Sequence, residues 1–349
     1  MAKYTFKLLQ HTPIIHFKPG DLPVRGTELK PAFDKFLNIT KKNRYKVRIR
    51  FNNLKSFPIN FRNSMYFGRG KKYVWADVEV EFFSFDNNMI EQIKREFPKF
   101  VSQYNFASRK TKGYGSFTTG DGFIPPKNKK IYYFQTSNWE RDLKLFYMYL
   151  RQGINYPGKF YSKPLIFKYA CDKGFKWEKK LIKESLSELN ITNPKVRHQP
   201  ITCKNDDLPA IIARDVFGLS TNQTWMDYKT DNINISVVKE HNQRKIARFA
   251  SPIFFKPVKI NGIYRVYFWV NNELYNLVKD ADFTLKIKAK KEVLKNLGSY
   301  NILNIDWEEF LDKDKYLNVE VLDELVSDRY KKDNNYSTLE KIIQGIKNV

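Results

Sequence analysis

The stretch RYKVRIRF, residues 44–51, alternates strictly between basic residues and apolar or aromatic ones. Val47, Ile49 and Phe51 fall on one side of the pattern, and the basic residues on the other are Arg44, Lys46, Arg48 and Arg50. Successive side chains of a β-strand point to opposite faces, so this pattern predicts a strand with one face on a core and one in solvent. Such a strand needs a sheet to pair with and a second layer to cover its apolar face.

Strand and helix patterns follow one another along the first half of the chain. We expect strands at residues 4–17, 44–51 and 74–85 and helices at 27–37 and 89–104, and after a glycine-containing loop a strand at 130–137 and a helix at 139–153. The order through residue 137 fits a ferredoxin-like unit, an antiparallel sheet backed by two helices. In this interpretation the strand at 130–137 completes the sheet.

The second half carries a similar mixture of elements. We expect strands at 165–174, 248–262, 263–272 and 282–291, helices at 177–189 and 207–220, and mostly helix in the last sixty residues. Asn261-Gly262 between two strand patterns is a strong hairpin signal. The predicted fold is α+β, with two tandem ferredoxin-like (RRM-like) domains built on antiparallel sheets and a helical C-terminal region. The predicted domains are residues 1–158 and 159–349, with a linker near 155–164.

The basic surplus of the chain points to a polyanionic partner. Its 349 residues include 62 Lys and Arg against 37 Asp and Glu, a formal net charge of +25. Such a charge favours nucleic acid or an anionic membrane surface. The basic residues are spread over strands and loops rather than along one amphipathic helix, so we expect no membrane partner. The chain is also rich in Lys, Asn and Ile, so compositional drift is an alternative source of part of the charge.

The two cysteines, Cys171 and Cys203, form no CxxC pair and no metal-ligand spacing. We therefore expect a reducing, cytoplasmic location and neither a metal nor a cofactor. The first residues alternate like a strand and lack the apolar core of a signal peptide. No run of 18 apolar residues occurs, so no membrane-spanning segment is expected.

The loop RKTKGYGSFTTGDG, residues 109–122, combines glycines, basic residues and aromatics. Glycines allow a phosphate to approach the backbone closely, and Arg109, Lys110 and Lys112 add positive charge. Tyr114 and Phe117 could stack on unpaired bases. The loop matches neither a Walker A loop nor a dinucleotide-binding fingerprint. The alternative is an ordinary hairpin loop whose aromatics pack into the core.

Several stretches in one order resemble a known family. They are FKLLQHTPIIHF, LPVRGTELKPAFDKFL, KTKGYGSF, IIARDVFGLS and FASPIFFKPV. Together they are similar to the RAMP superfamily, the repeat-associated proteins of CRISPR effector complexes, and most similar to the Cmr-type (type III-B) subunit that caps the guide-RNA 3′ end. The resemblance covers residues 4–37, 109–117 and 208–258, under half of the chain. ELKPAFDKFL departs from the usual family helix SLKGALR…R.

The resemblance implies RNA contacts at the first helix and at the glycine-containing loop. Arg25 and Lys30 would lie near phosphates at the helix start, where the backbone favours anions. The basic face of the strand at 44–51 and the loop GRGKK at 68–72 are further candidates. For Lys30 and for the strand face, plain solvent exposure is an equal alternative. The expected RNA-binding residues are Arg25, Lys30, Arg48, Arg50, Arg69, Arg109, Lys110, Lys112, Gly113, Tyr114, Gly115 and Phe117.

Catalytic candidates are few. Asp21 lies in the loop that holds an aspartate in RNA-cleaving RAMP subunits, but PGDLP is also an ordinary turn. Guide-processing relatives use a histidine, and His16 and His11 are the N-terminal candidates, with a purely structural role as the alternative. We therefore expect a non-catalytic subunit that binds guide RNA, and possibly target RNA, together with other CRISPR effector subunits. The alternatives are a metal-independent endoribonuclease that processes guide RNA and a structural or membrane-surface protein.

Overall fold

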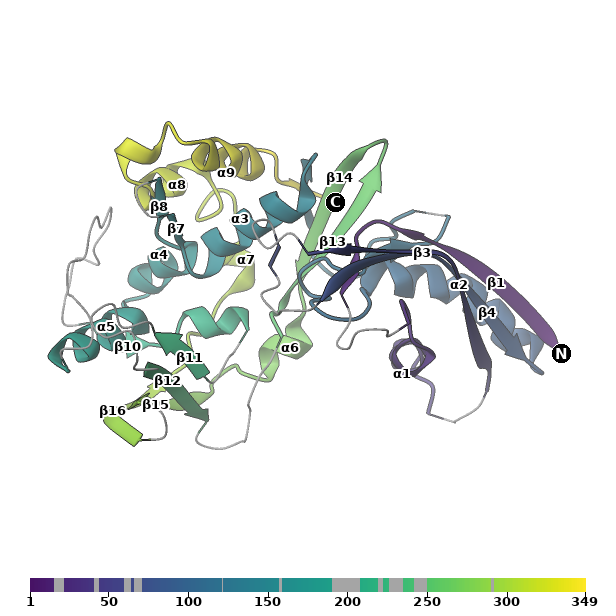
Figure 1. The fold of residues 1–349 in the computed structure, drawn as a ribbon, viewed down its shortest axis with the longest axis horizontal. Coiled ribbons are helices and arrows are strands. Elements are labelled where there is room, and N and C mark those ends of the chain that lie inside the picture. Colours follow the sequence, from purple (N-terminus) through teal and green to yellow (C-terminus); the bar gives the residue numbers. More distant parts are fainter. Residues whose placement is uncertain are drawn as a thin grey trace. The chain divides into compact units, whose positions relative to one another are not determined.

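The structure is a computed structural model that describes residues 1–15, 22–40, 44–59, 64–65, 71–120, 122–156, 159–189, 208–218, 222–225, 235–241, 250–289 and 292–349 (Figure 1). The chain forms two compact units. Unit 1 comprises Met1–Lys144, Ile253–Val270 and Gly345–Val349, and unit 2 comprises Leu145–Pro252 and Asn271–Gln344. Both units combine helices with antiparallel sheets, which confirms the predicted α+β class. Within the described residues, no helix has both the length and the apolar character needed to cross a membrane.

The first sheet of unit 1 is antiparallel throughout. Its strands are β1 (Ala2–Gln10), β2 (Ile14–Ile15), β3 (Lys46–Pro58), β4 (Lys72–Ser84) and β5 (Phe117–Thr118). Strand β4 pairs with β1, β2 and β3, and β1 pairs with β5 on its other side. The strand order β3-β4-β1-β5 therefore brings the glycine-containing loop into the sheet through β5.

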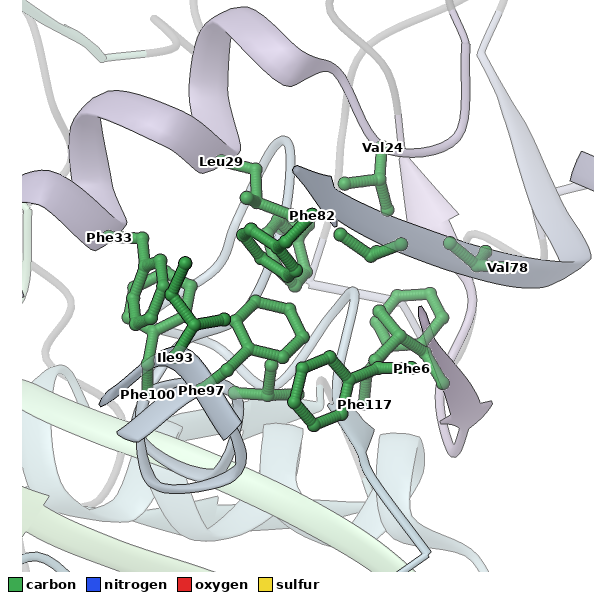
Figure 2. Packing of buried hydrophobic residues seen from close by; sticks show 14 of the residues in the cluster. Phe6, Val24, Leu29, Phe33, Val78, Phe82, Ile93, Phe97, Phe100 and Phe117 are labelled. Carbon is green, nitrogen blue, oxygen red and sulfur yellow. The ribbon is translucent and has the colours of Figure 1, made fainter. Parts of the chain in front are cut away.

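Helices α1 (Gly26–Phe36) and α2 (Asn87–Gln103) pack against one face of this sheet. Figure 2 shows Phe33 of α1 and Phe97 of α2 together with Phe82 of β4 in one buried cluster. The rings of Phe82 and Phe97 meet edge to face with centroids 4.8 Å apart. Aromatic contacts of this kind add to the free energy gained by burying apolar area. Asp86 caps α2 by accepting the N–H of Asn88 at 2.9 Å.

The strand expected at 130–137 exists but lies in another sheet, so that part of the prediction is wrong. Strand β6 (Tyr132–Thr136) pairs with β14 (Ile263–Val270) and β17 (Lys347–Asn348), and β13 (Ile253–Ile260) completes the order β13-β14-β6-β17. Aromatic side chains match across the strands, with the rings of Tyr132 and Phe268 stacked at 5.3 Å. The partner strand lies far along the chain, where local patterns carry no information about it.

The predicted hairpin at Asn261-Gly262 is confirmed. It joins β13 and β14, and both turn residues have positive φ, 50° for Asn261 and 85° for Gly262. Such angles suit the tight hairpin turns whose twist matches that of the strands. The predicted boundary at residue 158 would assign these strands to the second domain, whereas in the structure they pair with β6 of unit 1.

Unit 2 contains a second antiparallel sheet and most of the remaining helices. The sheet runs in the order β11 (Asn222–Trp225), β12 (Ile235–His241), β15 (Asp282–Ala289), β16 (Glu292–Asn301). Short strands pair as β7 (Ile154–Tyr156) with β8 (Phe160–Ser162) and as β9 (Lys176–Trp177) with β10 (Ala210–Ile211). The helices are α3 (Trp139–Arg151, begun in unit 1), α4 (Leu165–Asp172), α5 (Glu178–Glu188), α6 (Asn272–Asn276), α7 (Trp307–Phe310), α8 (Val319–Leu325) and α9 (Asn334–Gln344), with short 3-10 turns η1 (Arg214–Phe217) and η2 (Asp328–Tyr330).

Two expectations for this half of the chain have clear outcomes. The C-terminal region contains the predicted helices, α7, α8 and α9, but the last sixty residues are not mostly helical, because they begin with strand β16. The strand expected at 165–174 is wrong, because residues 165–172 form α4 with Leu165, Ile166 and Tyr169 buried. A short, continuously apolar run does not distinguish a buried strand from a buried helix. Cys203 lies outside the described residues.

Candidate functional site

The outer face of the first sheet of unit 1 carries the basic side chains of β3. Arg48 and Arg50 are exposed at 61% and 51% of their side-chain surface. Val47, Ile49 and Phe51 pack against the core on the opposite face. The alternation in the sequence is therefore confirmed, residue by residue, over the first half of β3.

Central strand β4 adds acidic side chains to the same face. In the strand register, Arg48 lies opposite Glu81 and Arg50 lies opposite Glu79. Both arginines contact Glu81, with N–O distances of 3.8 Å for Arg48 and 3.2 Å for Arg50. On the other side of β4, the Nζ of Lys7 on β1 lies 4.0 Å from Glu79. Basic outer strands thus flank an acidic central one.

We call this surface the basic sheet face and define it as Lys3, Lys7, Lys46, Arg48 and Arg50 together with Glu79 and Glu81. Its members carry five positive and two negative charges, and the exposed carboxylate of Asp77, opposite Asn52 in the register, continues the same face of β4. Ion pairs exposed to water contribute only about 0–1 kcal/mol each. That small value does not extend to Glu81, which is buried, but both arginines keep more than half of their side-chain surface exposed for a second acceptor such as a phosphate oxygen.

The start of α1 holds the next two candidates. The backbone carbonyl of Arg25 accepts the N–H of Glu28 at 3.0 Å and so begins the helix. The ammonium of Lys30 donates to Asp34 at 2.7 Å and lies 4.3 Å from the centre of the Tyr45 ring. Lys30 therefore has a structural role within unit 1, and RNA contacts at either residue remain a prediction.

The glycine-containing loop is buried from Thr111 to Thr119, which corrects the expectation that its aromatics stack on bases. Tyr114 and Phe117 have no exposed surface. The hydroxyl of Tyr114 donates to Glu140 at 2.6 Å and accepts the N–H of Met65 at 3.1 Å. Figure 2 shows Phe117 inside the same cluster as Phe6. The aromatics pack into the core, as in the alternative stated for this loop.

The loop glycines allow the backbone of the loop to lie close to other residues of unit 1. Gly113 has φ of +84°, and a Cβ there would lie 2.8 Å from Cγ of Pro257. Gly115 has φ of +66°, and a Cβ there would lie 2.1 Å from the carbonyl oxygen of Phe106. Both positions therefore require glycine for internal packing.

The basic residues of the loop differ in exposure. Arg109 is exposed, whereas Lys112 is buried at 7% relative exposure. Lys110 is partly buried and donates to the hydroxyl of Tyr104 at 2.9 Å. Among these three, Arg109 and Lys110 are accessible for a contact with RNA, and Lys112 is not.

A buried polar network that the sequence analysis missed links this loop to the hairpin of β13 and β14. Lys256 has no exposed surface, and its Nζ donates to the carbonyl oxygens of Val101 and Tyr104, each at 2.8 Å, and to Oδ1 of Asn105 at 3.1 Å. The one available signal was a lysine inside the apolar run IFFKPV of residues 253–258. A lysine in such a run is normally paired when it is buried.

His11 belongs to the same network. Its Nδ1 accepts the backbone N–H of Lys259 at 3.1 Å, so the ring proton is on Nε2, which donates to the hydroxyl of Thr118 at 2.8 Å. Burial, assisted by the charge of Lys256, lowers the pKa of His11 to about 3. The imidazole is neutral and both its nitrogens are engaged, so His11 is no candidate for acid–base catalysis.

We expect His11 to make unit 1 sensitive to acid. The unfolded chain binds a proton at His11 below pH 6.5 and the folded chain only near pH 3. The contribution to stability is thus complete above pH 6.5 and is lost as the pH falls toward 3. Between pH 7.5 and 5.0, wild type should lose about 2 kcal/mol more unfolding free energy than His11→Gln. Urea unfolding at both pH values measures this difference, and equal losses in the two proteins would show that His11 is protonated in the folded state.

Three candidates, His16, Asp21 and Arg69, lie outside the described residues. Within the described ranges, no group of three or more His, Cys, Asp and Glu side chains is placed to hold a metal ion. The structure therefore brings together the candidates on β3 and moves most of those in the glycine-containing loop into the interior.

Comparison with known proteins relates both halves of the chain to one family. The model of the Cmr1 N-terminal domain matches residues 1–47 and 38–154, and the model of the Cmr1 C-terminal domain matches residues 161–348. The chain is also similar to the crystal structure of Cmr1 from Pyrococcus furiosus in its apo form, with 12% sequence identity and a TM-score of 0.34 over 77% of this chain and 88% of that one. No curated protein matches the chain.

Proposed function

We propose that this chain, which belongs to the Cmr1 family of Cmr-type (type III-B) CRISPR RAMP proteins, is an RNA-binding subunit of a type III CRISPR effector ribonucleoprotein. Its partners in this proposal are guide RNA, target RNA and the other effector subunits, and its role is antiviral defence in the cytoplasm. The subunit position at the guide-RNA 3′ end is part of the same proposal.

The observation that carries the proposal is the basic sheet face. Arg48 and Arg50 project from the same face of β3, and both contact the largely buried carboxylate of Glu81 while more than half of each arginine side chain stays exposed. Arg48 also lies 5.2 Å from the centre of the Phe83 ring. Guanidinium groups bind phosphate oxygens with two parallel hydrogen bonds, which a lysine cannot do. Consecutive arginines on one strand face are therefore suited to successive phosphates of an RNA backbone.

We also propose that unit 1 is ferredoxin-like. The supporting observations are the strand order β3-β4-β1-β5 and the position of α1 after β1 and of α2 between β4 and β5. This is the β-α-β-β-α-β order, with β5 from the glycine-containing loop as its last strand. A second ferredoxin-like domain in the C-terminal half remains a prediction.

Binding without cleavage is the role we assign to the chain. His11 supports it, because its ring is neutral, buried and hydrogen-bonded at both nitrogens. The purified chain should leave guide and target RNA intact with and without Mg²⁺. Cleavage that disappears in His16→Ala or Asp21→Ala would instead establish the endoribonuclease alternative and name the group responsible.

The double variant Arg48→Gln/Arg50→Gln should weaken binding of single-stranded RNA by roughly three- to tenfold, because it removes two phosphate contacts. The slope of log K against log salt should fall in magnitude by about 1.4, since each phosphate contributes about 0.7. Fluorescence anisotropy with a labelled oligonucleotide at several salt concentrations measures both. The matched control is Arg95→Gln, which removes an exposed, ion-paired arginine from α2. Equal affinities and slopes in the double variant and the control would exclude the basic sheet face.

A further inference from the structure

Two lysines of unit 2 lie against two aromatic rings that contact each other. The Nζ of Lys163 is 4.1 Å from the centre of the Phe167 ring, and the Nζ of Lys179 is 5.0 Å from that of Trp177. The two rings meet edge to face with centroids 5.9 Å apart. Cations are attracted to aromatic faces, so this pair of rings gathers two ammonium groups at one place.

Three further cations interact electrostatically with Lys163 or Lys179. Lys180 and Lys183 lie on α5, and Arg214 begins η1. Burial, reinforced by the charges of Lys183 and Lys180, lowers the pKa of Lys163 to about 8. Burial likewise lowers the pKa of Lys179 to about 8, reinforced by the charges of Lys183 and Arg214. We call Lys163, Lys179, Lys180, Lys183 and Arg214 the lysine cluster.

Few carboxylates compensate this charge. Glu178 is buried and accepts the backbone N–H of Ala213 at 3.0 Å, and Glu184 lies 3.9 Å from Lys180. Five cations therefore face two carboxylates among the described residues. Lys179 and Lys180 also occupy the first turn of α5, where the helix dipole disfavours positive charge.

Arg214 gives an independent indication of a missing partner. Its Nε is buried and has no hydrogen-bond partner in the part of the chain that the structure describes. A buried guanidinium N–H normally has an acceptor, because leaving it without one costs free energy. Lys183 is exposed, so the cluster is reached from solvent on its side.

From this arrangement we propose that the lysine cluster is a phosphate-binding site for an RNA strand. The inference rests on the proposed function, since it adds to unit 2 an RNA contact separate from the basic sheet face of unit 1. A phosphate group brings negative charge and several acceptor oxygens, which offset the repulsion among the cations and offer an acceptor for the Nε of Arg214, which has none among the described residues. Its source is either an internal phosphodiester or a terminal phosphate of the strand.

The test uses the full chain and the double variant Lys179→Met/Lys183→Met. Methionine keeps an unbranched side chain of similar shape and removes the ammonium group, with its charge and its N–H donors. Lys279→Met is the matched control, because Lys279 is an exposed lysine of the same unit that follows α6. Two probes are used, inorganic tripolyphosphate in thermal unfolding and labelled single-stranded RNA in anisotropy.

We expect the double variant to bind RNA about tenfold more weakly than the control, with a salt slope smaller in magnitude by about 1.4. Tripolyphosphate should raise the unfolding temperature of the wild type and of the control but not that of the double variant. Without ligand, the double variant should unfold at the same or a higher temperature, because like-charge repulsion is relieved. The source of the phosphate follows from comparing RNA with a 3′-phosphate and RNA with a 3′-hydroxyl. Tighter binding of the 3′-phosphate form assigns the site to a terminal phosphate, and equal affinities of the two forms assign it to the phosphodiester backbone.

Two results would overturn the proposal. One is an RNA affinity and salt slope in the double variant equal to those of Lys279→Met. The other is a large loss of unfolding temperature in the double variant with no effect of tripolyphosphate on the wild type, which would make the lysines structural. If the wild type binds tripolyphosphate at the cluster but does not bind RNA, the proposed function fails and the phosphate site remains.

Discussion

The variant Lys256→Met is expected to lose about 3–5 kcal/mol of unfolding free energy, because three hydrogen bonds from a buried ammonium group are lost at once. Their acceptors are the carbonyl oxygens of Val101 and Tyr104 and Oδ1 of Asn105, all within 3.1 Å of Nζ. Methionine fills a similar volume, so the loss reports on the hydrogen bonds rather than on a cavity. The unfolding temperature should fall by roughly 10 °C, measured by circular dichroism.

The charge of Lys256 strengthens this expectation. Burial lowers its pKa well below the usual value. Three acceptors match the three N–H groups of an ammonium ion, and the carbonyls of Val101 and Tyr104 lie at the C-terminal end of α2, where a cation is favoured. We therefore expect the side chain to retain its proton at neutral pH through these contacts.

The matched control is Lys259→Met. Lys259 lies on the same strand, β13, and is exposed, and its bond to His11 uses the backbone N–H. This variant should remain within about 0.5 kcal/mol of wild type. Unfolding temperatures that agree between the two variants would show that the contacts of Lys256 contribute nothing net to unit 1.

The variant Gly115→Ala should destabilise unit 1 by about 2–5 kcal/mol or prevent its folding, because two costs add. A non-glycine residue at φ of +66° costs about 1–2 kcal/mol, and forcing an extra carbon into a packed interior costs about 1–3 kcal/mol more. The new Cβ would lie 2.1 Å from a backbone oxygen, that of Phe106. Two hydrogen bonds fix the backbone here. The N–H of Gly115 donates to the carbonyl oxygen of Pro13, and the carbonyl oxygen of Gly115 accepts the N–H of Phe106, each at 2.9 Å.

Gly120→Ala is the control from the same loop. Gly120 is exposed, and a Cβ there meets no atom within 4 Å. Its unfolding temperature should match that of the wild type to within about 2 °C. A Gly115→Ala protein that is as stable as Gly120→Ala but binds RNA less tightly would reverse our assignment and place the loop against RNA.

The sequence analysis succeeded where side-chain periodicity and turn chemistry act over a few residues. The alternation in RYKVRIRF reflects a strand with one buried face, and Asn261-Gly262 adopts the positive φ angles that only a few residue types tolerate. The same reasoning found α1 and α2 near their observed positions. Three of the RNA candidates, Arg48, Arg50 and Arg109, are exposed in the structure, as their position on a polar face or in a loop suggested.

The analysis failed where the outcome depends on distant partners. Whether Tyr114 faces solvent or the core is decided by Met65 and Glu140, and neither neighbours the loop in sequence. Strand β6 joins β14 rather than β1, and nothing local to residues 130–137 specifies that choice. The lysine cluster was missed because Lys163 and Arg214 join the three lysines of α5 only in space, and the five residues form no recognisable motif.

By itself, then, the sequence of this protein determined most local elements of the first half, the α+β class and the positive charge, since each depends on composition or on periods of two to four residues. Only the tertiary structure decided which basic and glycine residues meet solvent. The loop RKTKGYGSF became an interior segment because β5 pairs with β1 and because Lys256, far along the chain, anchors the hairpin of β13 and β14 to the end of α2. The physical reason is that burial and hydrogen bonding are satisfied by groups brought together in space, whatever their separation along the chain.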